Sequence, residues 1–318
     1  MLTVLRGRAA AIARWVLAIG IVVWSVWQLQ ASWGSIQASG LAFRPAQAAA
    51  AALAGALGLL TLMAVSGVGV LLARLPNVTG RTFWLGFARM WFIGYFFRYI
   101  PGKLVLVSER VRLGARLGIP ATAGVMLVVW ESLLLLAGSG LLGGVGLLFL
   151  PVQSDQPVSG GVIVALALGS LLGSVLMWPA LGLVARWFPA VLDRLPGLVL
   201  DVPAAWQVLL VIGNALGWGL LGLSFAFFCQ ATAPGDPPGT ALLVTWFVAS
   251  YVGGQLVSVS PAGIGVREGL IVAGLGAVAT GPVALAWAVG HRILLTLVEF
   301  ALEAVSALLP LPAEDRAG

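Results

Sequence analysis

Long, uninterrupted apolar segments are the feature that most restricts what this chain can fold into. Several of them exceed the ~18 residues that suffice for a membrane-spanning helix. Hydrophobic residues make up 60% of the 318-residue chain, charged residues only 9%, and the mean hydropathy is +1.06. The segments show no alternation of period two, which excludes barrel strands. A soluble fold is excluded by the same composition, so we expect an all-α, polytopic membrane helix bundle.

Apolar runs bounded by turn residues predict eight helices. Two further segments, 101–118 and 260–279, are too polar or too rich in glycine to be ordinary spans. The predicted helices are 14–31, 46–73, 82–100, 120–149, 160–185, 204–231, 240–258 and 283–309.

The distribution of Lys and Arg between these helices predicts the orientation of the chain. The N-terminus and the connections 74–81 and 186–203 carry Arg residues, which are typical of the cytoplasmic side. The connections 150–159 and 232–239 each hold an Asp and neither Lys nor Arg, so we expect them outside. Both chain termini are then cytoplasmic.

The segment 101–118 conflicts with this orientation if helix 82–100 is a full span. It holds four basic residues, which would then lie outside. The conflict disappears if 82–118 is a re-entrant hairpin that turns at Pro101 and Gly102. By the same reasoning the segment 240–279, which begins outside, turns near Pro261 and returns to the outside. We therefore expect six full spans and two re-entrant helical hairpins.

The order helix, hairpin, helix occurs twice, which predicts an internal repeat. Pro101 lies 55 residues after position 46, and Pro261 lies 57 residues after position 204. One copy starts outside and the other inside, so the repeat has inverted topology, as in many transporters. Residues 1–318 then form a single membrane domain, which divides into an anchor helix 14–31, a first repeat 46–150, a connecting helix 160–185 and a second repeat 204–310.

The first hairpin carries candidate substrate-binding residues. Pro101 and Gly102 break the helix, and a broken helix directs the positive end of its dipole into the gap. This arrangement suits a phosphate group, with Lys103 and Arg110 as counter-charges and Glu109 beside them. An amphipathic helix whose basic residues touch lipid head groups explains the same residues. The sequence leaves both interpretations open.

The second hairpin carries an adjacent Arg267 and Glu268 in a glycine-rich apolar segment that also holds Pro261, Gly263 and Gly265. The glycine spacing does not match a dinucleotide-binding fingerprint, and no strand precedes it. Buried ionisable residues at membrane depth are costly, which favours a substrate-binding role. The alternative is that the two charges only stabilise the turn.

The sequence of the last predicted helix, 283–309, places polar residues on one helical face, where they form a stripe. A further charged residue, Glu131, lies near the middle of helix 120–149. We expect the stripe to face the bundle and Glu131 to pair with Arg292 or Arg267. Ion pairs between helices and a substrate path explain these residues equally well. The stripe has steps of four and three residues and consists of Arg292, Thr296, Glu299, Glu303 and Ser306.

Motifs for catalysis or for cofactors are not found in the sequence. There is one histidine, His291, which we interpret as a packed side chain, and one cysteine, Cys229, which we interpret in the same way. No metal-ligand spacing and no nucleophile motif occurs. We expect no enzymatic activity, no metal and no cofactor. The net charge of +6 comes from Arg clusters between apolar runs, so we expect contact with anionic lipids and not with nucleic acid.

Residues 10–310 resemble the membrane domain of lysylphosphatidylglycerol synthases. Ala262 stands where glycine is commoner in that family. Because the chain ends at Gly318, soon after the last helix, the resemblance implies a stand-alone, lipid-translocating member without the aminoacyl-transferase domain. The resemblance rests on Pro101-Gly102-Lys103, Glu109, Arg110 and Glu131, on Pro261-Ala262-Gly263-Ile264-Gly265-Val266-Arg267-Glu268-Gly269, and on Arg292 and Glu299.

The leading hypothesis is therefore a flippase for a phospholipid, a polyprenyl phosphate or a related polar-headed lipid. One alternative is an ion-coupled transporter of a small solute that uses Glu131 and Glu299 as proton carriers. Another is a non-transporting membrane subunit that positions a glycosyltransferase. A homo-oligomer is left open. The Arg-rich, Lys-poor composition is typical of GC-rich bacterial genes, so we expect the bacterial cytoplasmic (inner) membrane.

Overall fold

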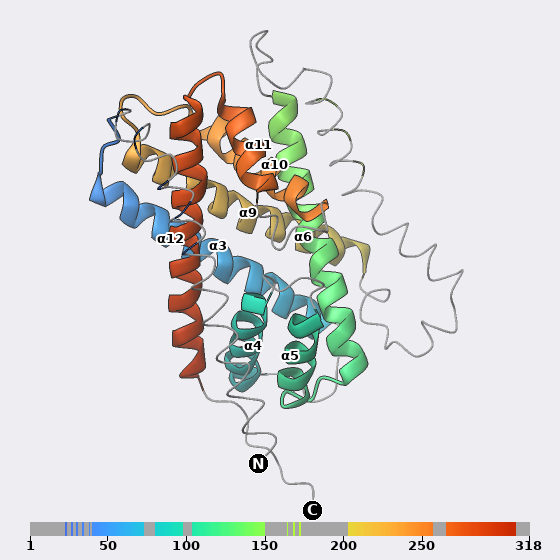
Figure 1. Cartoon of the computed structure of the whole chain (residues 1–318). Helices are drawn as coiled ribbons and strands as arrows, with labels where there is room; N and C mark the ends of the chain where they lie inside the picture. The colour runs from blue at the N-terminus through green and yellow to red at the C-terminus, as the bar shows by residue number, and fades with distance from the viewer. Residues whose placement is uncertain are drawn as a thin grey trace, which may run out of the picture.

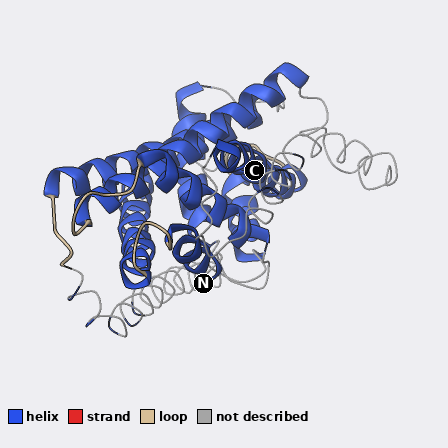
Figure 2. Ribbon diagram, turned by 90° about the horizontal axis from the view of Figure 1, so that it is seen from above, coloured by secondary structure: helices blue, strands red, loops and turns tan. Residues whose placement is uncertain are grey.

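The structure is a computed structural model that describes residues 40–72, 80–97, 104–149, 203–256 and 265–309, together with a few single positions in 23–38 and 164–172. Within these residues all regular secondary structure is helical, and eight helices are formed (Figures 1 and 2). The predicted all-α class is confirmed for the described part of the chain.

The eight helices fall into two successive sets of four with closely similar lengths. The first set contains 28, 17, 12 and 29 residues, and the second contains 29, 17, 10 and 27. The first set is α3 (Pro45–Leu72), α4 (Gly80–Phe96), α5 (Leu104–Ala115) and α6 (Ala121–Phe149). The second set is α9 (Ala204–Thr232), α10 (Thr240–Leu256), α11 (Val266–Leu275) and α12 (Gly281–Ala307).

Four of these helices, α3, α6, α9 and α12, are long and apolar enough to cross a membrane. They confirm four of the six predicted spans, with ends no more than two residues from the predicted positions. The other two predicted spans, 14–31 and 160–185, lie outside the described residues except for six single positions, all helical. The chain is therefore an α-helical membrane protein.

The remaining helices form two pairs, α4 with α5 and α10 with α11, and the members of each pair contact each other. At ~1.5 Å per residue, α5 and α11 measure only about 18 Å and 15 Å. The hydrocarbon core of a bilayer is ~30 Å thick, so neither helix can cross it. The predicted turns at Pro101-Gly102 and at Pro261 lie outside the described residues.

The contacts between helices repeat in the same pattern in the two sets. Helix α5 packs on α6 as α11 packs on α12, and α6 contacts α9 and α10 as α12 contacts α3 and α4. Helices α3 and α9, which begin the two sets, have the most extensive interface. In Figure 1, α4 and α5 lie toward one end of the bundle and α10 and α11 toward the other, with α6 and α12 along its sides.

The crossing of α3 and α9 depends on two glycines, Gly58 and Gly217. A Cβ atom added to Gly58 would lie 3.0 Å from the Gly217 oxygen and 2.9 Å from Leu221 Cγ. One added to Gly217 would lie 2.7 Å from Leu62 Cδ2 and 3.4 Å from the Gly58 oxygen. Each glycine is 13 residues after the first residue of its helix. Small residues of this kind let transmembrane helices approach backbone to backbone.

We expect Gly58→Ala and Gly217→Ala to destabilise the protein by about 1–3 kcal/mol, since each new methyl group overpacks the crossing. Gly219→Ala, also on α9, is the matched control because its Cβ would lie an ordinary 3.6 Å from Leu142 Cδ2. Thermal unfolding in detergent micelles measures the difference. Equal melting temperatures for all three variants would contradict the close crossing.

Candidate functional site

Six charged residues are buried among the described residues, each 7% exposed or less when the whole residue is counted. Three are cationic and three are anionic, so the buried set carries no net formal charge. A charge at membrane depth is costly unless it is paired and hydrogen-bonded, so the contacts of these groups determine what they can do. The six are Arg110 on α5, Glu131 on α6, Arg267 and Glu268 on α11, and Arg292 and Glu299 on α12.

The first buried ion pair joins α5 to α6. Arg110 Nη1 donates to Glu131 Oε2 at 2.6 Å, and the two side chains are 1% and 8% exposed. Ser66 and Trp91 also lie near the Glu131 carboxylate. The prediction that Glu131 pairs with Arg292 or Arg267 is therefore wrong. The tight turn between α5 and α6 brings Arg110 beside Glu131, 21 residues further along the chain.

The Arg110 side chain is held on its other side by α4. The Arg110 guanidinium carbon lies 5.7 Å from the centroid of the Trp91 ring. A Cβ atom added to Gly94 would lie only 2.5 Å from Arg110 Nε, so the bare backbone of Gly94 makes room for the arginine. The charge is thus enclosed by three helices of the first set, α4, α5 and α6.

The second buried ion pair joins α11 to α12. Arg292 Nη1 donates to Glu268 Oε1 at 2.5 Å, and both side chains are buried. The Gly265 backbone N–H donates to Glu268 Oε2 at 2.6 Å. Glu268 therefore caps the start of α11 with one oxygen and binds α12 with the other. Gly265 has φ +84°, a backbone conformation that favours glycine.

Arg267, next to Glu268 in sequence, contacts aromatic rings of α10. Its guanidinium carbon lies 3.4 Å from the centroid of Tyr251 and 5.7 Å from that of Phe247. Cation–π contacts of this kind strengthen when the cation is desolvated. Arg267 and Glu268 thus contact different helices, α10 and α12.

His291 is buried in a network of its own. Its Nε2 lies 3.0 Å from Ser224 Oγ, and Ser224 donates its hydroxyl proton to the Ala51 carbonyl at 2.7 Å. Because that proton is already committed, Nε2 acts as the donor to Ser224. Aromatic rings of Phe225, Phe228 and Phe247 surround the imidazole. The interpretation of His291 as a packed, hydrogen-bonded side chain is confirmed.

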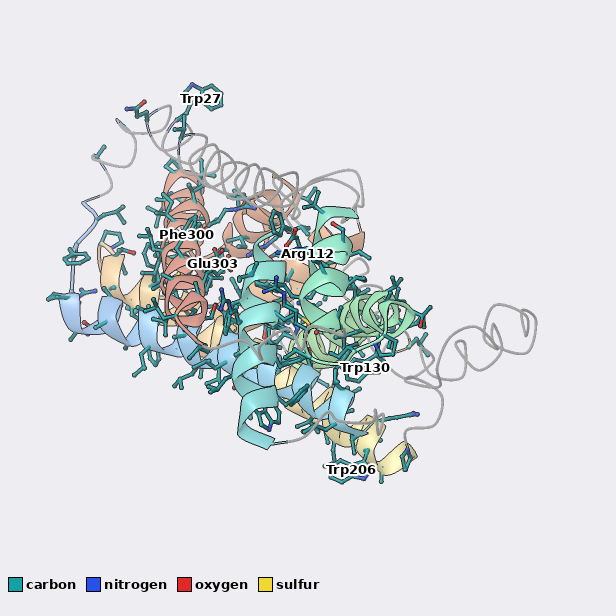
Figure 3. The ribbon with its side chains drawn as sticks, turned by 90° about the horizontal axis from the view of Figure 1, so that it is seen from below. Trp27, Arg112, Trp130, Trp206, Phe300 and Glu303 are labelled. Atoms are coloured by element: carbon teal, nitrogen blue, oxygen red, sulfur yellow. The ribbon has the colours of Figure 1, made fainter. Side chains whose placement is uncertain are left out.

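The predicted polar stripe on the last helix does face the bundle. Arg292, Thr296, Glu299 and Ser306 are buried, and Glu303 is half-buried. Glu303 is seen near Phe300 on α12 in Figure 3. Thr296 bonds back to the Arg292 carbonyl at 2.8 Å, which satisfies its hydroxyl within the helix.

Glu109, another predicted site residue, belongs to a different environment. It accepts from Arg112, one turn further along α5, at 2.5 Å, and the Arg112 side chain is 54% exposed. Arg112 is labelled in Figure 3. This pair is a surface pair, and it does not join the buried charges. Five predicted site residues lie outside the described part of the chain, namely Pro101, Gly102, Lys103, Pro261 and Gly263.

The structure therefore divides the predicted site in two. One part is Arg110 with Glu131, and the other is Gly265, Arg267 and Glu268 with Arg292. Their short helices, α5 and α11, lie toward opposite ends of the bundle in Figure 1. No group of three or more His, Cys, Asp or Glu side chains capable of holding a metal occurs among the described residues.

Sequence reasoning missed the aromatic partners of the two arginines. Trp91 on α4 contacts Arg110, and Tyr251 on α10 contacts Arg267. The two aromatic residues are 160 positions apart, and so are Phe87 and Phe247, one turn earlier. This constant offset is a signal that could have identified them, because the same register relates α4 to α10.

Comparison of the chain with the models of known protein families and with curated proteins gave no match in either case.

Proposed function

We propose that this protein is a flippase that moves a phospholipid, a polyprenyl phosphate or a related polar-headed lipid between leaflets. The observation that carries the proposal is the pair of buried Arg–Glu contacts. Each links a short helix that cannot cross the bilayer to the long helix that follows it. The bacterial inner membrane with both termini cytoplasmic is the proposed location, and membrane lipids are the proposed partners.

The chemistry of these contacts supports a phosphate-bearing head group. An arginine that binds a carboxylate can bind a phosphate with the same planar set of N–H donors. A head group that enters the bundle can therefore exchange places with Glu131 or Glu268, while the acyl chains stay in the bilayer. Without a ligand the glutamates keep the arginines neutralised, which limits the cost of holding charge at depth.

Two matched halves support an inverted repeat and alternating access. The helix lengths, the positions of Gly58 and Gly217, and the aromatic positions Trp91 and Tyr251 all recur at nearly constant offsets. In the proposed mechanism each pair of short helices is a re-entrant hairpin, one from either side. Rocking of one half against the other would expose the charged residues to each leaflet in turn.

The likeness of the two proline–glycine motifs to the membrane domain of lysylphosphatidylglycerol synthases supports the same function. We propose that the chain is a stand-alone, non-enzymatic relative of that domain.

Reconstitution into liposomes tests the proposal directly. Labelled anionic phospholipid and labelled polyprenyl phosphate are each offered to the native protein and to two variants. One variant is Arg267→Ala, and the other combines Arg110→Gln with Glu131→Gln, so that no single buried charge is left unpaired. We expect translocation above that of protein-free liposomes for the native protein and its loss in both variants.

Glu109→Gln is the matched control, because it alters a surface ion pair and leaves the buried charges intact. Its translocation rate should equal that of the native protein. Native protein that is folded and moves neither lipid would refute the flippase and favour the solute transporter or the glycosyltransferase partner. If both charge variants translocate lipid at the rate of the native protein, the buried charges have only a structural role.

A further inference from the structure

A groove lies between α11 and the first turn of α12, with a volume of about 540 Å³. This volume is within the range of ~300–1,000 Å³ that is typical of small-molecule sites. Its lining residues are Gly265, Glu268, Gly269, Val272, Ala273, Gly281, Pro282 and Leu285.

Glycines keep the groove open. A Cβ atom added to Gly265, Gly269 or Gly281 would have no atom within 4 Å. Gly269 and Gly281 are also exposed. This contrasts with Gly58 and Gly217, where an added Cβ would overlap a neighbouring helix. The glycines of the groove are therefore not required for helix packing, and their missing side chains leave space for a ligand.

The lining shows the chemical character of that ligand. Glu268 is the one charged residue among the lining residues, and both of its oxygens are already bonded, to Arg292 and to Gly265. The side chains that remain to contact a ligand are Val272, Ala273, Pro282 and Leu285. An occupant with polar groups would lose its hydration at these walls without compensation, whereas an alkyl chain would not.

The position of the groove relates it to the buried charges. It begins at Gly281, the first residue of α12, which the charge distribution predicts to lie at the outer side. Arg292 is 11 residues further along the helix, which corresponds to ~16 Å of helix length. The groove thus extends from the predicted outer end of α12 along α11 to Glu268, the partner of Arg292.

We propose that this groove binds one alkyl chain of a membrane lipid that enters from the outer leaflet. The proposal extends the proposed function, because the bound chain is then that of the transported lipid, placed beside the Glu268–Arg292 pair.

The test uses phosphatidylglycerol with a diazirine in one acyl chain, reconstituted with the full-length protein and activated by light. Cross-linked positions are identified by mass spectrometry. We expect labelling of Val272, Ala273 and Leu285 in the native protein that exceeds labelling of Leu53 and Leu57, two exposed apolar residues of α3. Labelling of the groove residues no stronger than that of Leu53 and Leu57 would overturn the proposal.

Two variants fill the groove, Gly269→Leu and Gly281→Leu. Each should lose the labelling at Val272, Ala273 and Leu285, while circular dichroism and size-exclusion profiles stay native. Gly239→Leu is the matched control, because a Cβ there also meets no atom within 4 Å but lies outside the groove. Unchanged labelling in a folded groove variant would also overturn the proposal.

This experiment is independent of translocation, so its failure and that of the flippase proposal can be told apart. Groove labelling in a native protein that moves no lipid would refute the flippase and leave the groove as an alkyl-chain site. If the native protein translocates lipid but its groove residues are not labelled, only the proposal that the groove binds an alkyl chain is refuted.

Discussion

Replacing Glu131 alone with alanine is expected to destabilise the protein by about 3–5 kcal/mol, because Arg110 is then left as an uncompensated buried charge. Arg110 is 1% exposed and enclosed by Trp91 and Gly94, so water cannot readily replace the carboxylate. Arg110→Ala should have a comparable effect, since it leaves Glu131 unpaired. Unfolding in mixed micelles with increasing SDS measures the free energy for each variant.

The decisive comparison is the double variant Arg110→Gln with Glu131→Gln. Removing both charges together eliminates the unpaired charge, and amide groups can still hydrogen-bond to each other. We expect the double variant to be more stable than either single alanine variant. If the losses of stability of the single variants Arg110→Gln and Glu131→Gln simply add in the double variant, the two residues do not interact and the pair is not a structural unit.

The second large effect is expected for Glu268→Ala. This change removes the ion pair with Arg292, at a cost of about 3–5 kcal/mol, together with the hydrogen bond from the Gly265 N–H. Loss of a helix cap adds about 0.5–2 kcal/mol in other proteins. The N-terminal turn of α11 should also exchange its amide hydrogens faster, which hydrogen–deuterium exchange detects in peptides covering 265–270.

Glu109→Ala is the internal standard for this second prediction. Glu109 also binds an arginine at 2.5 Å, but that arginine, Arg112, is 54% exposed. Exposed pairs contribute only about 0–1 kcal/mol, since water solvates either charge when its partner is lost. Glu268→Ala and Glu109→Ala with equal losses of stability would show that burial of the second pair has no energetic consequence.

Glu268→Gln separates the two roles of Glu268. Glutamine can still accept the Gly265 N–H bond, so the start of α11 should keep its protection from exchange. It cannot neutralise Arg292, so most of the loss in stability should remain. A glutamine variant as stable as the native protein would show that the negative charge of Glu268 is dispensable.

Local sequence patterns were sufficient to locate the four membrane helices of the described residues and the buried face of the last one. The hydropathy of a segment depends only on its own residues, so α3, α6, α9 and α12 were predicted to within two residues. The stripe on α12 followed from helical periodicity in the same way. The turns at Pro101-Gly102 and at Pro261 and the two full spans at 14–31 and 160–185 remain predictions, since only six single positions of the two spans are described.

The sequence alone thus determined that this is a helical membrane protein, which segments are long enough to span the bilayer and which face of α12 lies inward. Only the tertiary structure decided how those charges pair: Glu131 with Arg110, Glu268 with Arg292, and Arg267 against Tyr251. Pairing depends on which helices are neighbours and how each is rotated about its axis. Those relations arise from contacts between distant segments, such as the glycine-dependent crossing of α3 and α9, and hydropathy contains no information about them.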